Sequence, residues 1–183
     1  MLPPTYLLHG FNVRDSGKST TDQLIQPLQD NGHLTIDLDY GFWLLARVRL
    51  CNAPLAAVIA RMAMPNCALI GHSNGCTIAW LAAQAGAPAE RLILINPALD
   101  SNAAFPSLIG RIDVYYSPSD RPTWLAQWLP GNPWGAMGHT GYLGKDPRVT
   151  SHNLENILFR HVGHSDALHE PAFHNHLIGL FED

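Results

Sequence analysis

The chain of 183 residues contains 46% hydrophobic and 14% charged residues and has a formal net charge of -4. This composition excludes a disordered chain, because enough apolar side chains are present to bury a core, and the length fits a single domain. The small negative charge and the lack of a run of Lys or Arg argue against nucleic acid as a partner.

Cysteine usage and the N-terminus bear on the compartment. Cys51, Cys67 and Cys76 are an odd number of cysteines without CxxC spacing, which is typical of reduced thiols and not of a disulfide framework or a zinc site. The chain does not start with a charged region followed by an apolar stretch, and no window approaches the ~18 apolar residues that a membrane-spanning helix needs. We therefore expect a cytoplasmic protein without a membrane span.

Six short apolar runs, each ending near a turn signal, predict buried β-strands. They cover residues 5–8, 34–38, 67–70, 92–95, 112–116 and 156–159. Strands that are apolar along nearly their whole length are typical of a parallel sheet covered on both faces.

The segments between these runs have helical periodicity. Apolar residues between Leu55 and Met62 recur on one face, and the segment after Asn74 is rich in small alanines that let a helix lie close to a sheet. Pro27 predicts that the helix over residues 20–31 is kinked or short. The alternation predicts an α/β fold with a doubly wound, mostly parallel sheet of about six strands and helices on both faces. Ligands of such sheets bind beyond the carboxyl ends of the strands.

The segment 121–150 interrupts the alternation with several prolines and glycines and with Trp124, Trp128 and Trp134. Connections of this length in compact domains are usually lids or functional loops. We expect residues 1–183 to form a single domain with a small cap over this segment. The three tryptophans are candidates for an apolar wall that contacts the substrate.

The motif Gly71-His72-Ser73-Asn74-Gly75 stands directly after an apolar run and directly before the alanine-rich helix. A GxSxG motif in this context is typical of a nucleophile elbow, a strained turn that lifts the serine hydroxyl clear of the sheet. Glycine flanks the turn because larger side chains there would collide. The N-terminus of the next helix favours negative charge in front of Ser73. The motif predicts that Ser73 is a nucleophile.

A serine hydroxyl needs a general base, and the base needs a carboxylate that orients it. Asp120 follows the run 112–116, and His164 follows the last apolar run. Both come after Ser73 in the order Ser, acid, His that accompanies this kind of elbow. Asp100 also follows a strand and is the alternative acid.

Four segments together resemble the α/β-hydrolase superfamily, in the small form that lacks the first two strands. They are His9-Gly10-Phe11, Gly71-His72-Ser73-Asn74-Gly75, Ser117-Pro118-Ser119-Asp120 and Gly163-His164. The resemblance covers nearly the whole chain. It implies a small serine esterase or lipase-like protein whose oxyanion hole is built from the backbone amides of Phe11 and Asn74.

Two other features suggest different chemistry. Ten histidines invite a metal site, yet no HExxH motif or Cys/His set has a recognised ligand spacing, so we expect no metal. Ser16-Gly17-Lys18-Ser19-Thr20 imitates the end of a phosphate-binding loop, but Asn12 stands where the full pattern needs glycine. Nucleotide hydrolysis at Lys18 is therefore the weaker interpretation.

The sequence thus predicts a serine hydrolase that cleaves a carboxylic ester through an acyl-enzyme, without a metal or an organic cofactor. The expected substrate is a small-molecule ester with an apolar acyl part. Thioester and amide bonds stay open as substrates of the same triad, and so does the oligomeric state. A protein-binding module on a hydrolase scaffold is the alternative from another functional class, because a fold alone does not establish activity.

Overall fold

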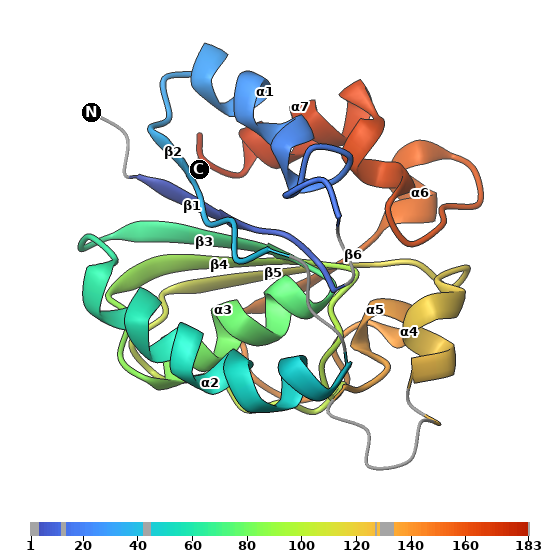
Figure 1. Ribbon diagram of the computed structural model, residues 1–183. Helices are drawn as coiled ribbons and strands as arrows, with labels where there is room; N and C mark the ends of the chain where they lie inside the picture. The colour runs from blue at the N-terminus through green and yellow to red at the C-terminus, as the bar shows by residue number, and fades with distance from the viewer. Residues whose placement is uncertain (1–3, 12–13, 42–44, 127, 129–133, 183) are drawn as a thin grey trace.

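The computed structural model describes residues 4–11, 14–41, 45–126, 128 and 134–182. Six strands form one sheet in the order β2-β1-β3-β4-β5-β6, and each adjacent pair is parallel (Figure 1). The strands are β1 (Thr5–Leu8), β2 (Thr35–Asp37), β3 (Cys67–His72), β4 (Ala89–Ile95), β5 (Arg111–Tyr116) and β6 (Val149–Asn153).

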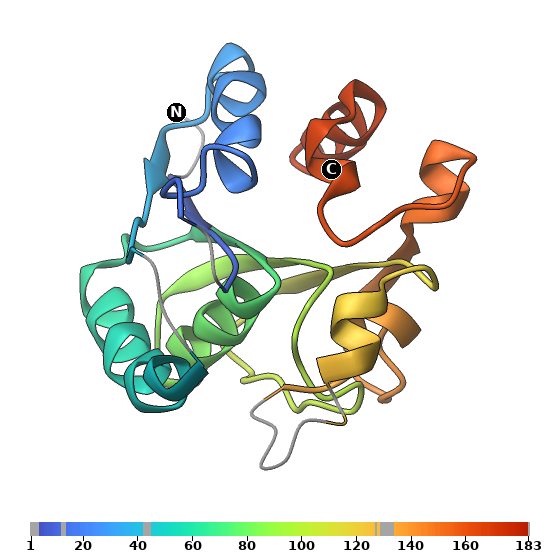
Figure 2. The ribbon, with the colours of Figure 1, turned by 45° about the vertical axis from the view of Figure 1, so that its right-hand side comes forward.

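Helices cover both faces of the sheet (Figure 2). On one face lie α2 (Leu45–Met62) and α3 (Asn74–Gln84). On the other face lie η1 (Thr21–Leu24), α1 (Ile25–Asp30), α6 (Leu154–Leu158), η2 (Asp166–His169) and α7 (Pro171–Gly179). Two short helices, α4 (Arg121–Ala126) and α5 (Met137–Thr140), lie beyond the carboxyl end of β5. The prediction of a doubly wound parallel α/β fold is confirmed.

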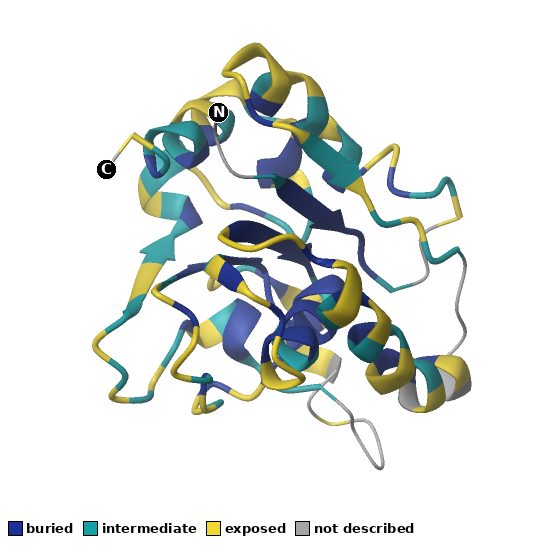
Figure 3. Cartoon of the chain, turned by 90° about the vertical axis from the view of Figure 1, so that its left-hand side faces the viewer, coloured by how far each residue is buried: buried dark blue, intermediate teal, exposed yellow. Residues whose placement is uncertain are grey.

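The sheet separates two hydrophobic cores, so that the central strands β1, β3, β4 and β5 are largely buried on both sides, while β2, β6 and the outer faces of the helices are partly exposed (Figure 3). Successive residues of a strand point to opposite faces. Tyr6 and Leu8 therefore pack in the core under α2 and α3, whereas Leu7 packs in the core under α1 and α7. This two-sided burial is why the strand sequences are apolar along nearly their whole length.

The prediction of a strand over residues 156–159 is wrong. Most of these residues belong to α6, and the last strand is β6, which contains Thr150, Ser151 and His152. Among the described strands, β6 pairs with β5 alone and forms the edge of the sheet, where polar side chains are accommodated. The Asn153 side chain accepts a hydrogen bond from the Glu155 amide, which caps α6 and ends the strand.

The segment around Pro27 divides into the 3-10 helix η1 and the short helix α1, as the proline predicted. Pro27 is the third residue of α1, where a helix has no intrahelical acceptor for an N–H group. The segment 121–150 contains α4 and α5, and its last residues already belong to β6. Within the described part of the chain, no helix is both long and apolar enough to cross a membrane.

Candidate active site

Ser73 stands on the turn between β3 and α3 with φ 54° and ψ -119°. A non-glycine residue with positive φ is strained and persists only where its surroundings hold it. Here the Ser73 amide donates to the Ile95 carbonyl at 3.0 Å, and the Ser73 carbonyl accepts from the amides of Cys76 at 3.1 Å and Ala98 at 3.2 Å. The turn is therefore fixed by β4 and by the loop that follows it.

Two glycines of the motif allow the close approach of this turn to its neighbours. A Cβ atom on Gly75 would lie 2.1 Å from the carbonyl oxygen of Leu8, and one on Gly71 would lie 2.6 Å from the Cys76 amide nitrogen. Both distances are far below van der Waals contact with backbone atoms that cannot move independently. The GxSxG spacing thus follows from the packing of the start of α3 against β1 and β3.

His164 is paired with Asp120. Nδ1 of His164 lies 3.0 Å from Oδ1 and 2.9 Å from Oδ2 of Asp120, whose side chain is fully buried in the loop after β5. A carboxylate only accepts hydrogen bonds, so Nδ1 is the protonated nitrogen and Nε2 of a neutral His164 keeps a lone pair. Nε2 can therefore accept a proton.

Two further groups hold the Asp120 carboxylate, and sequence analysis did not identify either. Asn96 Nδ2 donates to Oδ2 at 2.9 Å, and the Thr123 amide donates to Oδ1 at 3.1 Å. Asn96 directly follows β4, and this position after a strand was the only sequence signal for it. The alternative acid, Asp100, accepts from the Asn102 amide at 2.8 Å and is exposed, so the structure pairs His164 with Asp120.

His72 connects the elbow to the His164 loop. Its Nε2 lies 2.9 Å from the His164 carbonyl oxygen, and the centroids of the two imidazole rings are 4.8 Å apart. Burial, reinforced by the nearby His164, lowers the pKa of His72 to about 3. His72 is therefore neutral and donates through Nε2, while its Nδ1 is buried without a partner.

The loop after β1 lies directly against the elbow. A Cβ atom on Gly10 would be 3.1 Å from Cβ of Ser73, so a larger residue here would require Ser73 or its surroundings to shift by a few tenths of an ångström. The Tyr40 hydroxyl lies 2.5 Å from the His9 carbonyl oxygen and 3.0 Å from that of Gly10, and the Tyr40 and His9 rings stack at 4.0 Å. These contacts position the backbone that leads into Phe11.

Of the three tryptophans predicted to contact the substrate, the structure brings Trp134 to the elbow. Its Nε1 donates to Oδ1 of the buried Asn74 at 2.9 Å, and its ring centroid lies 5.2 Å from that of Phe11. Trp124 and Trp128 are 43% and 72% exposed. Contact of these two residues with a substrate stays a prediction.

Asn74 is itself held by a second buried amide. Asn52 of α2 and Asn74 exchange two side-chain hydrogen bonds, of 2.9 and 3.2 Å. The start of α3 is thus tied to both α2 and Trp134. Over the described ranges, no cluster of three or more His, Cys, Asp or Glu side chains is suited to hold a metal ion.

The described geometry is that of the α/β-hydrolase fold, and comparison with solved structures agrees. Alpha/beta hydrolase domain-containing protein 10 from mouse is similar with a TM-score of 0.63 and 15% identity, over 99% of this chain and 88% of that one. An esterase from Pyrococcus furiosus has a TM-score of 0.60 and 10% identity, over 98% and 81%. A thioesterase domain from the curacin biosynthetic pathway has a TM-score of 0.58 and 15% identity, over 100% and 91%.

At the level of sequence, no family model and no curated protein matches the chain. At these identities the structural likeness shows the fold. The chain has the α/β-hydrolase fold, as its sequence motifs predicted.

Proposed function

We propose that this protein is a serine hydrolase of carboxylic esters, with Ser73 as the nucleophile, His164 as the general base and Asp120 as the orienting acid. The observation that carries the proposal is the hydrogen-bonded pair of Asp120 and His164, at 2.9 to 3.0 Å. In addition, the His164 carbonyl accepts a hydrogen bond from His72, the residue before Ser73. The strained turn that carries Ser73 is thus linked to the His164 loop by this hydrogen bond.

In the proposed reaction, Ser73 Oγ attacks the carbonyl carbon of the ester while His164 Nε2 takes the hydroxyl proton. Asp120 stabilises the imidazolium and keeps Nδ1 protonated. Collapse of the tetrahedral intermediate transfers the proton from Nε2 to the leaving alcohol and forms an acyl-serine. Water, activated by the same nitrogen, then hydrolyses the acyl-enzyme and regenerates Ser73.

The negative oxygen of the intermediate would be bound by the backbone amides of Phe11 and Asn74. The Asn74 amide belongs to the first residue of α3, where helix N–H groups have no intrahelical acceptor. The helix N-terminus adds a favourable electrostatic potential for an anion. Loss of one such donor typically costs on the order of 100-fold or more in rate.

We infer a small-molecule substrate with an apolar acyl part, since Trp134 and Phe11 present aromatic surface beside the elbow. Thioester and amide bonds can be cleaved by the same proton transfers, so experiment must decide which of the three bond types the protein prefers. The mechanism needs no metal or organic cofactor.

The test is labelling of the purified protein with a fluorophosphonate probe, with peptide mapping by mass spectrometry and a parallel series of p-nitrophenyl esters of increasing chain length. Covalent modification at Ser73 and ester turnover, both lost in Ser73→Ala, are expected. A p-nitrophenyl thioester and an anilide of the same acid compare the three bond types. A folded protein that is neither labelled nor active on any of them would instead support a binding module on a hydrolase scaffold.

A further inference from the structure

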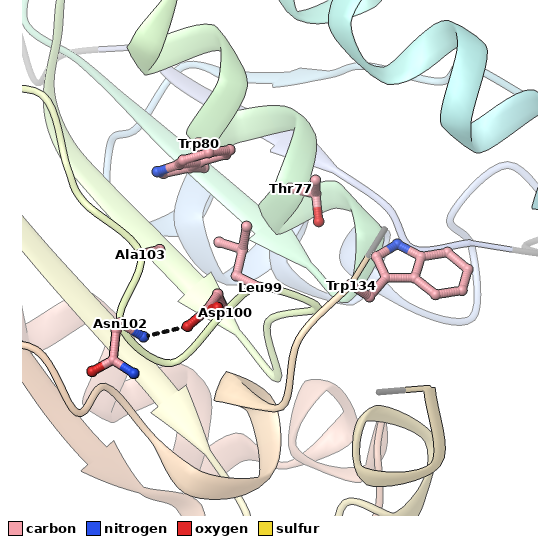
Figure 4. Close-up of a pocket in the computed structure, with 7 residues that line it drawn as sticks. All are labelled: Thr77, Trp80, Leu99, Asp100, Asn102, Ala103 and Trp134. Atoms are coloured by element: carbon pink, nitrogen blue, oxygen red, sulfur yellow. Dashed lines mark hydrogen bonds between the residues drawn. The ribbon is translucent and has the colours of Figure 1, made fainter. Parts of the chain in front are cut away.

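A cavity of about 410 Å³ lies beside the elbow, between α3 and the loop that follows β4. Three of its lining residues, Trp80, Asp100 and Trp134, come from α3, from that loop and from the segment before α5 (Figure 4). Thr77 and Leu99 also line it. In the proposed mechanism, none of these side chains transfers a proton or binds the oxyanion.

Hydrogen bonds fix the walls of this cavity. The Thr77 hydroxyl donates to the Ala98 carbonyl at 2.8 Å, which holds the loop against α3 at one end. Nε1 of Trp80 donates to the Ala104 carbonyl at 2.9 Å, which holds the other end. Because the N–H groups of Trp80 and Trp134 are both engaged, these bonds hold the two indoles in place and the rings contribute apolar rather than hydrogen-bonding surface to the lining.

The described residues that line the cavity give it a negative charge. Asp100 is the only charged side chain among the described residues that line it. Arg148 contacts the later part of the connection between β4 and β5, where it pairs with Asp146 and donates to the carbonyls of Phe105, Pro106 and Ile109. A carboxylate therefore repels anionic groups from this space and attracts cations.

Two indoles and one carboxylate are the chemistry that recognises an ammonium group. A cation on the face of a tryptophan ring is attracted by the ring quadrupole, and quaternary ammonium ligands are bound by such aromatic surfaces. We propose that this cavity binds an alkylammonium group. Together with the proposed function, on which this step rests, the cavity assigns the substrate class: an ester that carries a positively charged ammonium group a few bonds from the scissile carbonyl.

The position of the cavity supports this link to the elbow. Trp134 is bonded to the side chain of Asn74, the residue after Ser73, and Thr77 lies about one helical turn, roughly 5 Å, further along α3. A substrate held at Ser73 can therefore reach the cavity with a short linker.

The binding test uses Ser73→Ala protein, in which no turnover interferes. Choline is titrated by calorimetry against its uncharged isostere 3,3-dimethylbutan-1-ol and against the anion hexanoate. We expect choline to bind more tightly than the alcohol, hexanoate to bind least, and Asp100→Asn to reduce the choline-to-alcohol affinity ratio roughly tenfold. The matched control is Asp30→Asn on α1, which removes an exposed carboxylate on the opposite face of the sheet and should leave the ratio unchanged.

The proposal would be overturned by equal affinity for choline and the alcohol, by stronger binding of hexanoate, by no binding of any probe, or by an unchanged ratio in folded Asp100→Asn.

A kinetic experiment compares kcat/KM for a choline ester and the corresponding 3,3-dimethylbutyl ester in the wild type and in Asp100→Asn. We expect the same fall in the ratio of the two values. Choline binding without turnover of any ester would leave the cavity assignment intact and contradict the proposed hydrolase. Ester turnover without choline binding would contradict the cavity assignment and leave the proposed hydrolase intact.

Discussion

Asn96 donates a hydrogen bond of 2.9 Å to the carboxylate of Asp120, although the two residues follow different strands, β4 and β5. Asn96 has φ 45°, a conformation that an Asn adopts more easily than most residues but that still costs free energy. The strained backbone aims the side-chain amide at Asp120. In the proposed mechanism, Asn96 is a positioning residue that acts through Asp120 on His164.

Replacement of Asn96 by Gly or by Ala separates its positioning role from its structural one. Both variants lose the hydrogen bond, and we expect kcat to fall about tenfold in each with KM nearly unchanged, since a hydrogen bond to a charged group contributes on the order of 1.5 kcal/mol. Gly relieves the positive φ, so Asn96→Ala should be the less stable of the two by about 1 kcal/mol. Steady-state kinetics and urea unfolding of the pair check this, and activity that follows stability would contradict the positioning role.

The depressed pKa of His72 predicts a pH dependence of stability. Its pKa is about 3 in the folded protein and 6.5 as a reference, so below pH 6.5 the unfolded chain binds a proton that the folded chain does not. The free energy of unfolding therefore falls as the pH decreases from 6.5 toward 3, by up to about 1.4 kcal/mol per pH unit from this group.

The comparison that isolates this contribution is His72→Gln, which removes the titrating group but keeps a side-chain donor for the His164 carbonyl. We expect the wild type to lose more stability than His72→Gln between pH 6.5 and 4.5, measured by urea unfolding at several pH values. Identical pH slopes for the two proteins would mean that His72 does not stay neutral on folding.

The buried pair Asn52 and Asn74 predicts a non-additive effect on stability. Asn52→Ala leaves the Asn74 amide short of a partner at a fully buried position, which typically costs about 1 to 3 kcal/mol. The double variant Asn52→Ala/Asn74→Ala removes both partners, so it should be less destabilised than the sum of the two single variants. A double-mutant cycle of unfolding free energies measures the coupling, and strict additivity would contradict it.

Ser73 and Asp120 could be placed beside one another from sequence because they follow the parallel strands β3 and β5, which end on the same side of the sheet. His164 was selected after a strand that proved to be the helix α6, and its contact with Asp120 is known from the structure. Asn96 and the contact of His72 with His164 were missed, since they depend on side-chain directions across neighbouring strands. β6 was missed because Thr150, Ser151 and His152 give it no apolar run.

The apolar run mistaken for β6 ends at Phe159, which has φ 52° and is 92% exposed at the end of α6. Hydrophobic pattern alone cannot distinguish such a short helix from a strand. The strands with two-sided burial were predicted because burial on both faces leaves a continuous apolar sequence.

The last prediction concerns the close packing of the elbow and compares two glycines. In Gly75→Ala, the new methyl group would lie 2.1 Å from the Leu8 carbonyl oxygen, so α3 would have to move away from β1. We expect a loss of several kcal/mol of stability and of all activity, because displacement of α3 also moves Ser73 and the Asn74 amide. In Gly179→Ala, the same methyl group has no neighbour within 4 Å at the end of α7. Thermal unfolding should show this control to be unchanged or stabilised by up to about 1 kcal/mol, and a Gly75→Ala protein of similar stability to the control would refute the packing argument.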